Sequence, residues 1–240
     1  MSSAHPDLLV APCSYQAAKY AVEKWHYSRS MPTSPLVMFG VWEDASFVGA
    51  VLFGRGSNNN GHKPYGIKQT EFCELVRVAL RKHSNNVSKI VAICIKQLAK
   101  QSPGLRLIVS YADMNQEHVG TIYQAGNWIY TGKTGSDFRA VDANGRVWHS
   151  RQVSSTGVKR QYGQLRAVPK LDDCEIVPIL PKHRYLYPLD RAMRKQIAPL
   201  AQPYPKKDTR PVKGDILTAS ERDWFDPMSG ALENPSDGAP

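Results

Sequence analysis

The spacing of apolar residues along the chain predicts an alternation of strands and helices. Residues 36–43 and 47–54 are rich in apolar, β-branched and aromatic side chains and flank a short polar turn, which predicts a β-hairpin. From Ser14, which suits a helix N-cap, apolar residues recur at helical spacing until about Arg29. A further, mostly buried helix is predicted over 87–100.

Two more strands, 74–80 and 105–112, enclose this second helix in the sequence. A strand–helix–strand unit predicts parallel pairing with a right-handed crossover. Strict alternation along the first strand places Glu74, Val76, Val78 and Leu80 on one face and Leu75, Arg77 and Ala79 on the other.

The rest of the chain extends the same pattern. We expect a helix at about 116–126, a strand at 128–132, a hairpin over 138–150 that turns at Asn144-Gly145, a final strand within 174–187 and a short helix at about 190–197. The Gly- and Asn-rich residues 55–70 are typical of a loop. This order of elements indicates an α/β fold with a mixed sheet.

Composition suggests where the folded part begins and ends. Residues 1–12 are expected to form an arm, 13–200 one domain with a basic C-terminal extension, and 201–240 a disordered tail. The formal charge is +10, and the tail holds five basic and seven acidic residues, so the positive charge belongs to the residues before it. Such an excess favours a polyanionic partner.

No feature of the sequence indicates secretion or a membrane. The four cysteines form no C-x-x-C pair, and Cys73 and Cys94 lie in apolar runs where buried free thiols are usual. There is neither a signal-peptide pattern nor an apolar run of membrane-spanning length. We therefore expect a protein of a reducing cytoplasm, with no membrane partner.

Four unusual stretches occur in a fixed order. They are WHYSRS (25–30), PYGIKQTEFCE (64–74), ELVRVAL (74–80) and YADMNQEHVGTIYQAGNWIYTG (111–132). In this order they resemble the phage Mom proteins, relatives of the GNAT acyltransferases, over roughly residues 13–200. The resemblance implies a GNAT-like α/β fold. Its mixed sheet is splayed at the centre and flanked by helices, with the acyl donor between strands 74–80 and 105–112.

The resemblance also implies an activity. Mom-type proteins are phage-encoded transferases that place a carbamoylmethyl group on N6 of adenine in double-stranded DNA, which protects the DNA from restriction in the host bacterial cytoplasm. Iron has been proposed as their cofactor. Two other functions stay open: a conventional N-acetyltransferase, and a non-catalytic phage DNA-binding protein. The sequence indicates no oligomeric state.

One departure from the GNAT pattern concerns the acyl donor. GNAT enzymes usually hold the pyrophosphate of coenzyme A in a Gly-rich loop after the first central strand, whereas LRKHSNNVSKIV (80–91) has no glycine. Arg81, Lys82 and Ser88 are candidates for binding an anion there, beside the amides of the helix N-terminus. Carbamoylmethyl and glycyl groups are isomers. The donor is therefore either glycine-derived, such as glycyl-tRNA, or acetyl-CoA combined with iron chemistry.

Transfer to adenine N6 needs a base taken out of the stack, a proton acceptor and a positioned electrophile. His26 is a candidate general base or metal ligand and Tyr27 a candidate stacking ring, although a helix end with an aromatic neighbour explains both. Glu74 is a catalytic carboxylate or a strand-end charge. Asp113 is a base, a metal ligand, an adenine-edge acceptor or a helix N-cap.

Four further residues are candidates for the donor end of the site. Tyr123 lies where GNAT enzymes often carry a tyrosine that protonates the leaving thiolate, but it could instead pack against Trp128. His118 binds the donor or a metal, or lies on the surface, and Asn127 binds the donor or ends a helix. Arg77, a charge in an apolar strand, must meet a carboxylate or an anionic ligand.

Metal and DNA sites are indicated less directly. No H-x-x-x-H spacing occurs, so His26, Asp113 and His118 are weak candidates for an iron site. Between 133 and 195 there are thirteen basic and six acidic residues, interleaved with aromatics, which suits phosphates and bases but also a solvated surface. The DNA-binding candidates are Arg29, Lys63, Lys159, Arg160, Arg166, Lys182 and Arg184, with His183 and the rings of Tyr162, Tyr185 and Tyr187.

Overall fold

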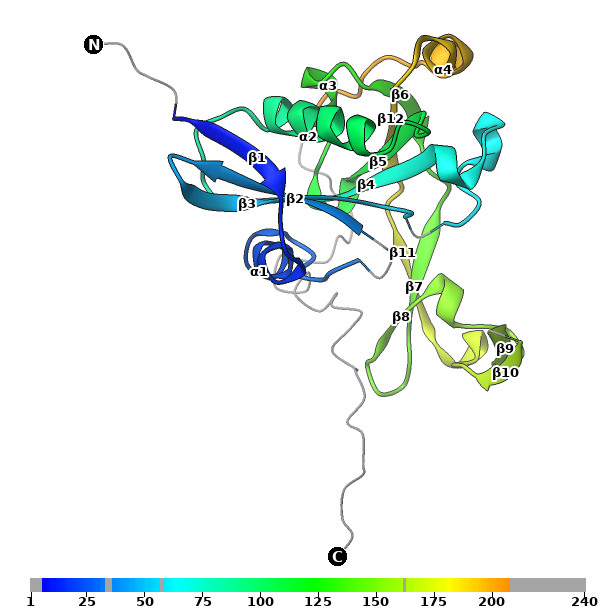
Figure 1. Ribbon diagram of the computed structural model, residues 1–240. Coiled ribbons are helices and arrows are strands. Elements are labelled where there is room, and N and C mark those ends of the chain that lie inside the picture. The colour runs from blue at the N-terminus through cyan, green and yellow to red at the C-terminus, as the bar shows by residue number, and fades with distance from the viewer. Residues whose placement is uncertain (1–5, 33–35, 57, 162, 208–240) are drawn as a thin grey trace, which may run out of the picture. The chain divides into compact units, whose positions relative to one another are not determined.

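The computed structural model describes residues 6–32, 36–56, 58–161 and 163–207 (Figure 1). The chain divides into two compact units. One contains the described residues up to Ser136 and from Leu180 onward, and the other is Asp137–Ile179.

The first unit is built on a seven-stranded sheet, in the order β1-β2-β3-β4-β5-β12-β6. Its strands are β1 (Leu8–Pro12), β2 (Leu36–Glu43), β3 (Ser46–Gly54), β4 (Phe72–Leu80), β5 (Leu107–Asp113), β6 (Ile129–Lys133) and β12 (Lys182–Pro188). Every neighbouring pair is antiparallel except β4 and β5. The parallel pairing expected on either side of the second helix is therefore confirmed.

Helices cover both faces of this sheet (Figure 1). They are α1 (Tyr15–Trp25), α2 (Val87–Gln101), α3 (Thr121–Ala125) and α4 (Arg191–Ile197). The small residues Ala18 and Ala21 of α1 pack against Ala50 and Ala79, with Leu52 in the same buried cluster. The apolar side of α2 packs on a larger, separate cluster that includes Phe39 and Ile108. As expected, Ser14 caps α1: its hydroxyl accepts the amide of Ala17 at 3.2 Å.

The two central strands separate after a short paired stretch. β4 and β5 pair only over Phe72–Glu74 and Leu107–Val109. Just beyond, the Ser110 hydroxyl donates to the carbonyl oxygen of Leu75 at 2.9 Å, so a side chain replaces the next ladder bond. This mixed, centrally splayed sheet flanked by helices confirms the expected fold class, and its open end is called the fork below.

A bulge changes the expected faces of β4. Leu52 of β3 pairs with Arg77 and Phe53 pairs with Leu75, so Val76 has no partner of its own. Because Leu52 and Gly54 share one face of β3, their partners Arg77 and Glu74 share a face of β4. The alternation predicted from sequence, which separated Glu74 from Arg77, is therefore wrong. An extra residue re-aims the side chains that follow it.

Three other expectations need correction. Residues 8–12, expected in an arm, form β1, which pairs with β2. The helix expected at 116–126 is interrupted, because Glu117 (φ +56°) and Gly120 (φ +76°) adopt left-handed conformations between a short 3₁₀ turn, Met114–Gln116, and α3. The segment 174–187 holds two strands, β11 (Glu175–Ile179) and β12, rather than one.

Outside the sheet, short 3₁₀ turns at Lys63–Tyr65 and Gln69–Glu71 lie within the expected loop, and another, Ala198–Leu200, follows α4. Residues 201–207 form no helix or strand, and residues 1–5 and 208–240 lie outside the described residues.

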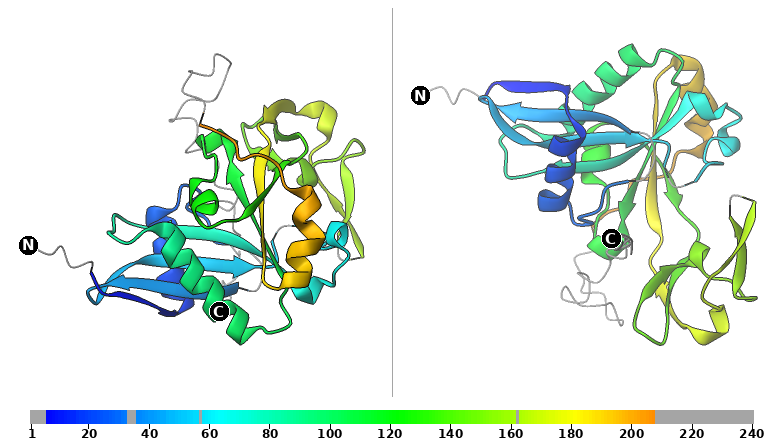
Figure 2. Two further views of the ribbon diagram at one scale, coloured as in Figure 1. Left: turned by 90° about the horizontal axis from the view of Figure 1, so that it is seen from above. Right: turned by 60° about the horizontal axis from the view of Figure 1, so that its bottom comes forward.

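The second unit consists of two small sheets (Figure 2). Strands β7 (Asp137–Val141) and β8 (Val147–His149) form the expected hairpin, with Gly145 at φ +75° in its turn, and β11 completes a three-stranded sheet. Strands β9 (Val158–Gln161) and β10 (Gln164–Ala167) form a separate two-stranded ribbon. Short 3₁₀ turns lie at Ser150–Gln152 and Leu171–Asp173.

The thiols agree with the sequence expectation. All four cysteines are free, Cys94 is buried and Cys73 is half-buried. Among the described residues, no helix is long and apolar enough to cross a membrane.

Candidate active site

Glu74 lies where β4 and β5 part, and its environment shifts its proton affinity. Burial raises the pKa of its carboxyl to about 7, while the positive charges of Lys182 and Arg77 oppose the shift. Gly56, at φ +75°, lies so close that a methyl group there would collide with Oε2 of Glu74. Near neutral pH the carboxyl therefore exchanges a proton readily, which suits a general base or acid.

His26 follows α1 and is held in one orientation. Its Nδ1 accepts the backbone amide of Ser28 at 3.1 Å and lies 2.8 Å from the Ser28 hydroxyl. Burial, together with the charges of Arg77 and His118, lowers its pKa to about 3. Since Nδ1 is an acceptor, the neutral ring carries its proton on Nε2. His26 is thus placed as a hydrogen-bond donor, because a ring with a pKa of about 3 and an engaged Nδ1 is a poor general base.

The ring of Tyr27 connects His26 with His118. Its centroid lies 4.3 Å from that of His26 and 5.7 Å from that of His118, which meets it edge-on. The side chain is 49% exposed, yet burial of its phenol end still raises its pKa, and the charge of Asp113 adds to this. A half-exposed aromatic face next to titratable groups can stack on a flat ring.

Asp113 ends β5 and performs the capping role expected of it. Its Oδ1 accepts the backbone amide of Asn115 at 3.0 Å and the Asn115 side-chain amide at 2.9 Å. The other oxygen, Oδ2, lies 3.8 Å from Nζ of Lys182, so one oxygen is held in the turn and the other faces a charge. The cap is confirmed, and a catalytic role stays a prediction.

Tyr123 of α3 reaches the fork through its hydroxyl, which contacts Ser110 of β5. Its hydroxyl oxygen lies 2.8 Å from Oγ of Ser110, and the single proton of that Ser110 hydroxyl faces both the Tyr123 oxygen and the Leu75 carbonyl oxygen. Burial raises the pKa of Tyr123 to about 12; the bond to Ser110 lowers it, and the charge of Glu74 raises it. The phenol therefore keeps its proton and could deliver it to a leaving group. It also packs against Trp128, as the alternative expected.

Arg77 lies between these groups. Its Nε donates to the carbonyl of Ser30 at 3.2 Å and its Nη1 to the carbonyl of Val76 at 2.8 Å. Burial lowers its pKa, whereas Tyr27 and Glu74 oppose that shift. Arg77 thus ties the loop after α1 to the bulge of β4. The candidates from three separate motifs, His26, Tyr27, Glu74, Arg77, Asp113, His118 and Tyr123, gather around the fork.

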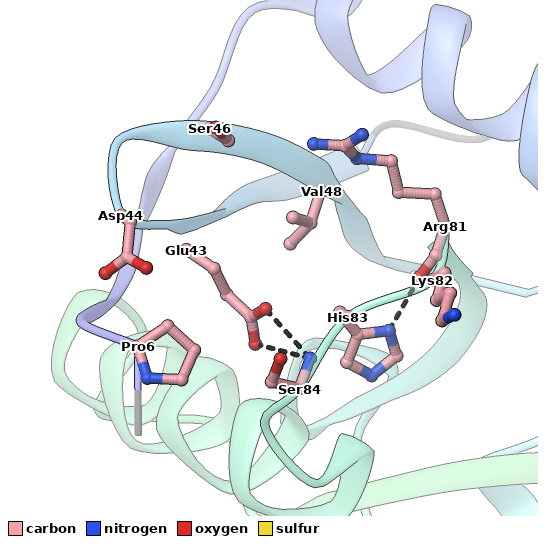
Figure 3. A pocket seen from close by; sticks show the side chains of 9 residues that line it. All are labelled: Pro6, Glu43, Asp44, Ser46, Val48, Arg81, Lys82, His83 and Ser84. Carbon is pink, nitrogen blue, oxygen red and sulfur yellow. Dashed lines mark hydrogen bonds between the residues drawn. The ribbon is translucent and has the colours of Figure 1, made fainter. Parts of the chain in front are cut away.

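The donor-binding candidates Arg81 and Lys82 lie elsewhere. They line a pocket of about 440 Å³ between the β2–β3 turn and the loop before α2, together with Glu43 and Asp44 (Figure 3). Ser88, in the first turn of α2, does not line it. Asn127 adopts φ +56° just after α3, which supports its interpretation as a helix-ending residue.

The DNA-binding candidates divide into several groups. Arg160 and Arg166 are exposed on the β9–β10 ribbon, and Arg29 and Lys63 are exposed in the first unit. Lys159, on the same ribbon, donates to the carbonyl of Arg151 at 2.6 Å.

Two candidates of β12 have partners inside the first unit. Arg184 is engaged by Thr131, donating to its hydroxyl at 2.9 Å and to its carbonyl at 3.1 Å. Lys182 belongs to the fork, beside Asp113.

Two of the aromatic and basic neighbours named with them were wrongly placed on the surface. Tyr185 has no exposed surface and His183 is buried against the hydroxyl of Tyr130, so neither can stack on a base or meet a phosphate. Tyr187 is half-buried, and Tyr162 lies outside the described residues.

The donor set does not fit an iron centre. Within the part of the chain that the structure describes, no three His, Cys, Asp or Glu side chains come close enough together to hold a metal ion. His26 and His118 approach the same ring, but Nδ1 of His26 is already engaged. We assign no step to iron.

Sequence reasoning missed several residues of the site. Ser110 and Gly56 act through close contacts with distant segments, and a lone Ser or Gly gives no local signal of that. Lys182 was expected at DNA, and the basic composition around it gave no indication that β12 would place it beside Asp113.

Comparison with known proteins identifies the family. The model of the Mom protein family matches residues 7–206. The chain belongs to the Mom family. It is also 26% identical, over 209 residues, to the methylcarbamoylase Mom of Escherichia phage Mu, covering 83% of this chain and 84% of that protein.

Solved structures resemble the chain only distantly. FeeM, an N-acyl amino acid synthase from uncultured soil microbes, is 13% identical with a TM-score of 0.41, covering 81% of this chain and 97% of that one. An acetyltransferase from Thermus thermophilus is 13% identical with a TM-score of 0.40, covering 78% of this chain and 100% of that one. Such low overlap assigns no activity to this member of the Mom family.

Proposed function

We propose that this Mom-family chain is a phage DNA-modifying transferase that places a carbamoylmethyl group on N6 of adenine in double-stranded DNA and so protects the DNA from restriction. One observation carries the proposal. The motifs WHYSRS, ELVRVAL and YADMNQEHVG–TIY, far apart in sequence, bring their titratable and aromatic side chains together at the fork. Membership of the Mom family supports a role in DNA modification.

The acceptor side of the fork suits adenine. The N6 amine is a weak nucleophile because its lone pair is delocalised into the ring, so it needs a base out of the stack and a proton acceptor. Tyr27 offers a half-exposed ring for the flipped base, and Nε2–H of His26 is a donor beside it. Glu74, with a pKa of about 7, accepts the N6 proton as the N6–carbon bond forms.

The donor side suits an activated carbonyl. As N6 attacks, the bond from the carbonyl carbon to the donor's ester or thioester atom breaks, and the Tyr123 phenol supplies the proton for that leaving group. A glycyl group delivered in this way is an isomer of the carbamoylmethyl product, so transfer from a glycine-derived donor such as glycyl-tRNA needs only a rearrangement. Acetyl-CoA would require an additional source of nitrogen.

A second surface suits the DNA backbone. Residues 143–171 contain no Asp or Glu but hold six cations: Arg146, Arg151, Lys159, Arg160, Arg166 and Lys170. In the β9–β10 ribbon, Arg160 pairs with Leu165 and Arg166 with Lys159, so cations extend from both faces of a narrow, exposed ribbon. A polyanion is the natural partner of such a segment. A phage enzyme of this kind would work in the host bacterial cytoplasm.

The direct test is mass spectrometry of deoxyadenosine from plasmid DNA of cells that express the chain. We expect a nucleoside heavier by one glycine residue, its loss in Glu74→Gln, and its retention in Glu23→Gln, an exposed carboxylate of α1 that pairs with Lys19 of the same helix. Isotope-labelled glycine should appear in the product. Unmodified adenine in the presence of folded wild-type protein would overturn the proposal and favour a DNA-binding or acetyltransferase role.

A further inference from the structure

The loop between β4 and α2 already holds an anion, and that anion is the chain's own Glu43. Its carboxylate accepts the backbone amide of Ser84 at 2.8 Å and that of Asn85 at 2.7 Å (Figure 3 shows the Ser84 contacts). The side-chain amide of Asn85 donates to the same carboxylate at 2.8 Å. Glu43 comes from the end of β2, so these contacts join two segments about forty residues apart.

This carboxylate is held as a charged group. Glu43 is 8% exposed and Asn85 is 4% exposed. Burial raises the pKa of Glu43, but the hydrogen bonds from Asn85 and Ser84 outweigh burial and leave its pKa below the usual value. Asn85 is itself fixed, because its oxygen accepts from Nζ of Lys89 at 2.9 Å and its amide also donates to the carbonyl of Pro6 at 3.3 Å. The arrangement is a built anion site with a permanent occupant.

The same loop is where the fold expected from the resemblance would hold the pyrophosphate of coenzyme A. In this chain the backbone amides of Ser84 and Asn85 already donate to Glu43. A diphosphate bound there would therefore lie against a buried carboxylate, with Asp44 as a second acid in the same pocket. Arg81 and Lys82 line the pocket, but they do not free the amides (Figure 3). Like charges in a partly buried site repel strongly. The residues present do not fit coenzyme A.

We propose that Glu43 permanently replaces the donor's diphosphate in this chain, so that the acyl donor is not a coenzyme A thioester. The donor is then an activated acyl ester whose acyl group binds at the fork. Binding of the group that carries the acyl does not require the backbone amides at the start of α2. This inference rests on the proposed function only in assuming that a donor is needed. It deepens that proposal by naming the donor's class.

Calorimetric titration of the full chain with acetyl-CoA and with inorganic pyrophosphate tests the inference. We expect no saturable binding of either by the wild type at millimolar concentration. The double variant Arg81→Ala/Lys82→Ala should keep full DNA modification in cells. Saturable binding of acetyl-CoA by the wild type that the double variant weakens by about tenfold or more, a loss expected when charge-assisted phosphate contacts are removed, would overturn the proposal.

A variant that gains pyrophosphate binding would support the inference with a positive result. Glu43→Ala exposes the amides of Ser84 and Asn85, so pyrophosphate should raise its melting temperature while leaving that of the wild type unchanged. If Glu43→Ala folds and pyrophosphate does not raise its melting temperature, the amides of Ser84 and Asn85 form no anion site. If Glu43→Ala does not fold, the wild-type titrations and the Arg81/Lys82 variant still decide. DNA that stays unmodified while acetyl-CoA fails to bind would contradict the proposed function and leave this inference standing.

Discussion

Glu74 and Arg77 share one face of β4 although they are three residues apart. Regular alternation would place them on opposite faces, and the bulge at Val76 removes that conflict. The result is a carboxyl and a guanidinium on the α1 side of the sheet, where each influences the pKa of the other. The site therefore depends on a local irregularity in the strand as well as on the side chains themselves.

The raised pKa of Glu74 predicts how activity depends on pH. If Glu74 accepts the N6 proton, its ionised form is the active one, so the rate of modification should rise as pH increases through about 7. Glu74→Gln should reduce the rate by roughly a hundredfold and remove this limb of the profile. Single-turnover assays on a DNA duplex from pH 5.5 to 8.5 would measure it. A limb that persists in Glu74→Gln would assign the titration to another group.

The same shift predicts a stability effect of opposite sign. Because the folded-state pKa of Glu74 lies above its ordinary value of 4.5, ionisation opposes folding, and stability is lost as pH rises from about 4.5 through about 7. Glu74→Gln lacks this loss. Its melting temperature relative to the wild type should therefore increase over that range, and calorimetry at several pH values would show this. A constant difference would mean that the carboxyl is better solvated than its position indicates.

The close contact between Gly56 and Glu74 predicts that a methyl group added at position 56 would disrupt the site. Gly56→Ala would put a Cβ against Oε2 of Glu74 and force a left-handed backbone on alanine, at a cost of about 1–3 kcal/mol. We expect DNA modification to fall sharply. Gly145→Ala is the matched control, since Gly145 has the same φ of +75° and nothing lies within 4 Å of its added Cβ, and it should modify DNA normally. Equal activity of the two variants would show that the loop at Gly56 moves away freely.

The hydrogen bonds of His26 predict a neutral ring in acid solution. With a pKa of about 3 and Nδ1 engaged by Ser28, the imidazole should stay in the Nε2–H form from pH 8 down to about pH 4.5. Nitrogen-detected NMR of histidine-labelled protein reads the tautomer directly, with exposed His118 as an internal comparison. Protonation of His26 near pH 6.5 would restore its candidacy as a general base.

The β9–β10 ribbon predicts how DNA affinity depends on salt. Arg160→Ala/Arg166→Ala removes two exposed cations, so affinity for DNA of any sequence should fall and the slope of log K against log salt should decrease by about two. Arg191→Ala/Arg194→Ala, which removes two exposed cations of α4, is the charge-matched control. Identical slopes for the two double variants would place the DNA contact elsewhere.

Much of the fold could be predicted from sequence because its signals are local. The helix after Ser14, the hairpin over 138–150 and the unit formed by β4, α2 and β5 all follow from apolar spacing, a cap or a turn sequence. The distinctive motifs also supplied the candidate residues that the structure brings together at the fork, and their catalytic roles stay predictions. The resemblance placed the acyl donor between β4 and β5, and that placement also stays a prediction.

The remaining features depend on tertiary contacts that have no local signal. Nothing in LFGRG shows that Gly56 covers Glu74, and nothing around Glu43 shows that its carboxylate is bound by a loop some forty residues later. Tyr185 and His183 have the composition of a basic, aromatic surface but lie on a strand between two others, so they are buried. Alternation misplaced Arg77 because a single bulged residue reverses it.

The hydroxyl of Ser110 links the strength of the fold to its reactivity. Its proton faces both the Leu75 carbonyl that the diverging strands leave unpaired and the phenol oxygen of Tyr123. Removing this oxygen would leave a buried acceptor without its donor and would also free the phenol that we propose as the acid. Selection acting on thermal robustness and selection acting on turnover therefore meet at a single atom, so this position has little freedom to improve one property without disturbing the other.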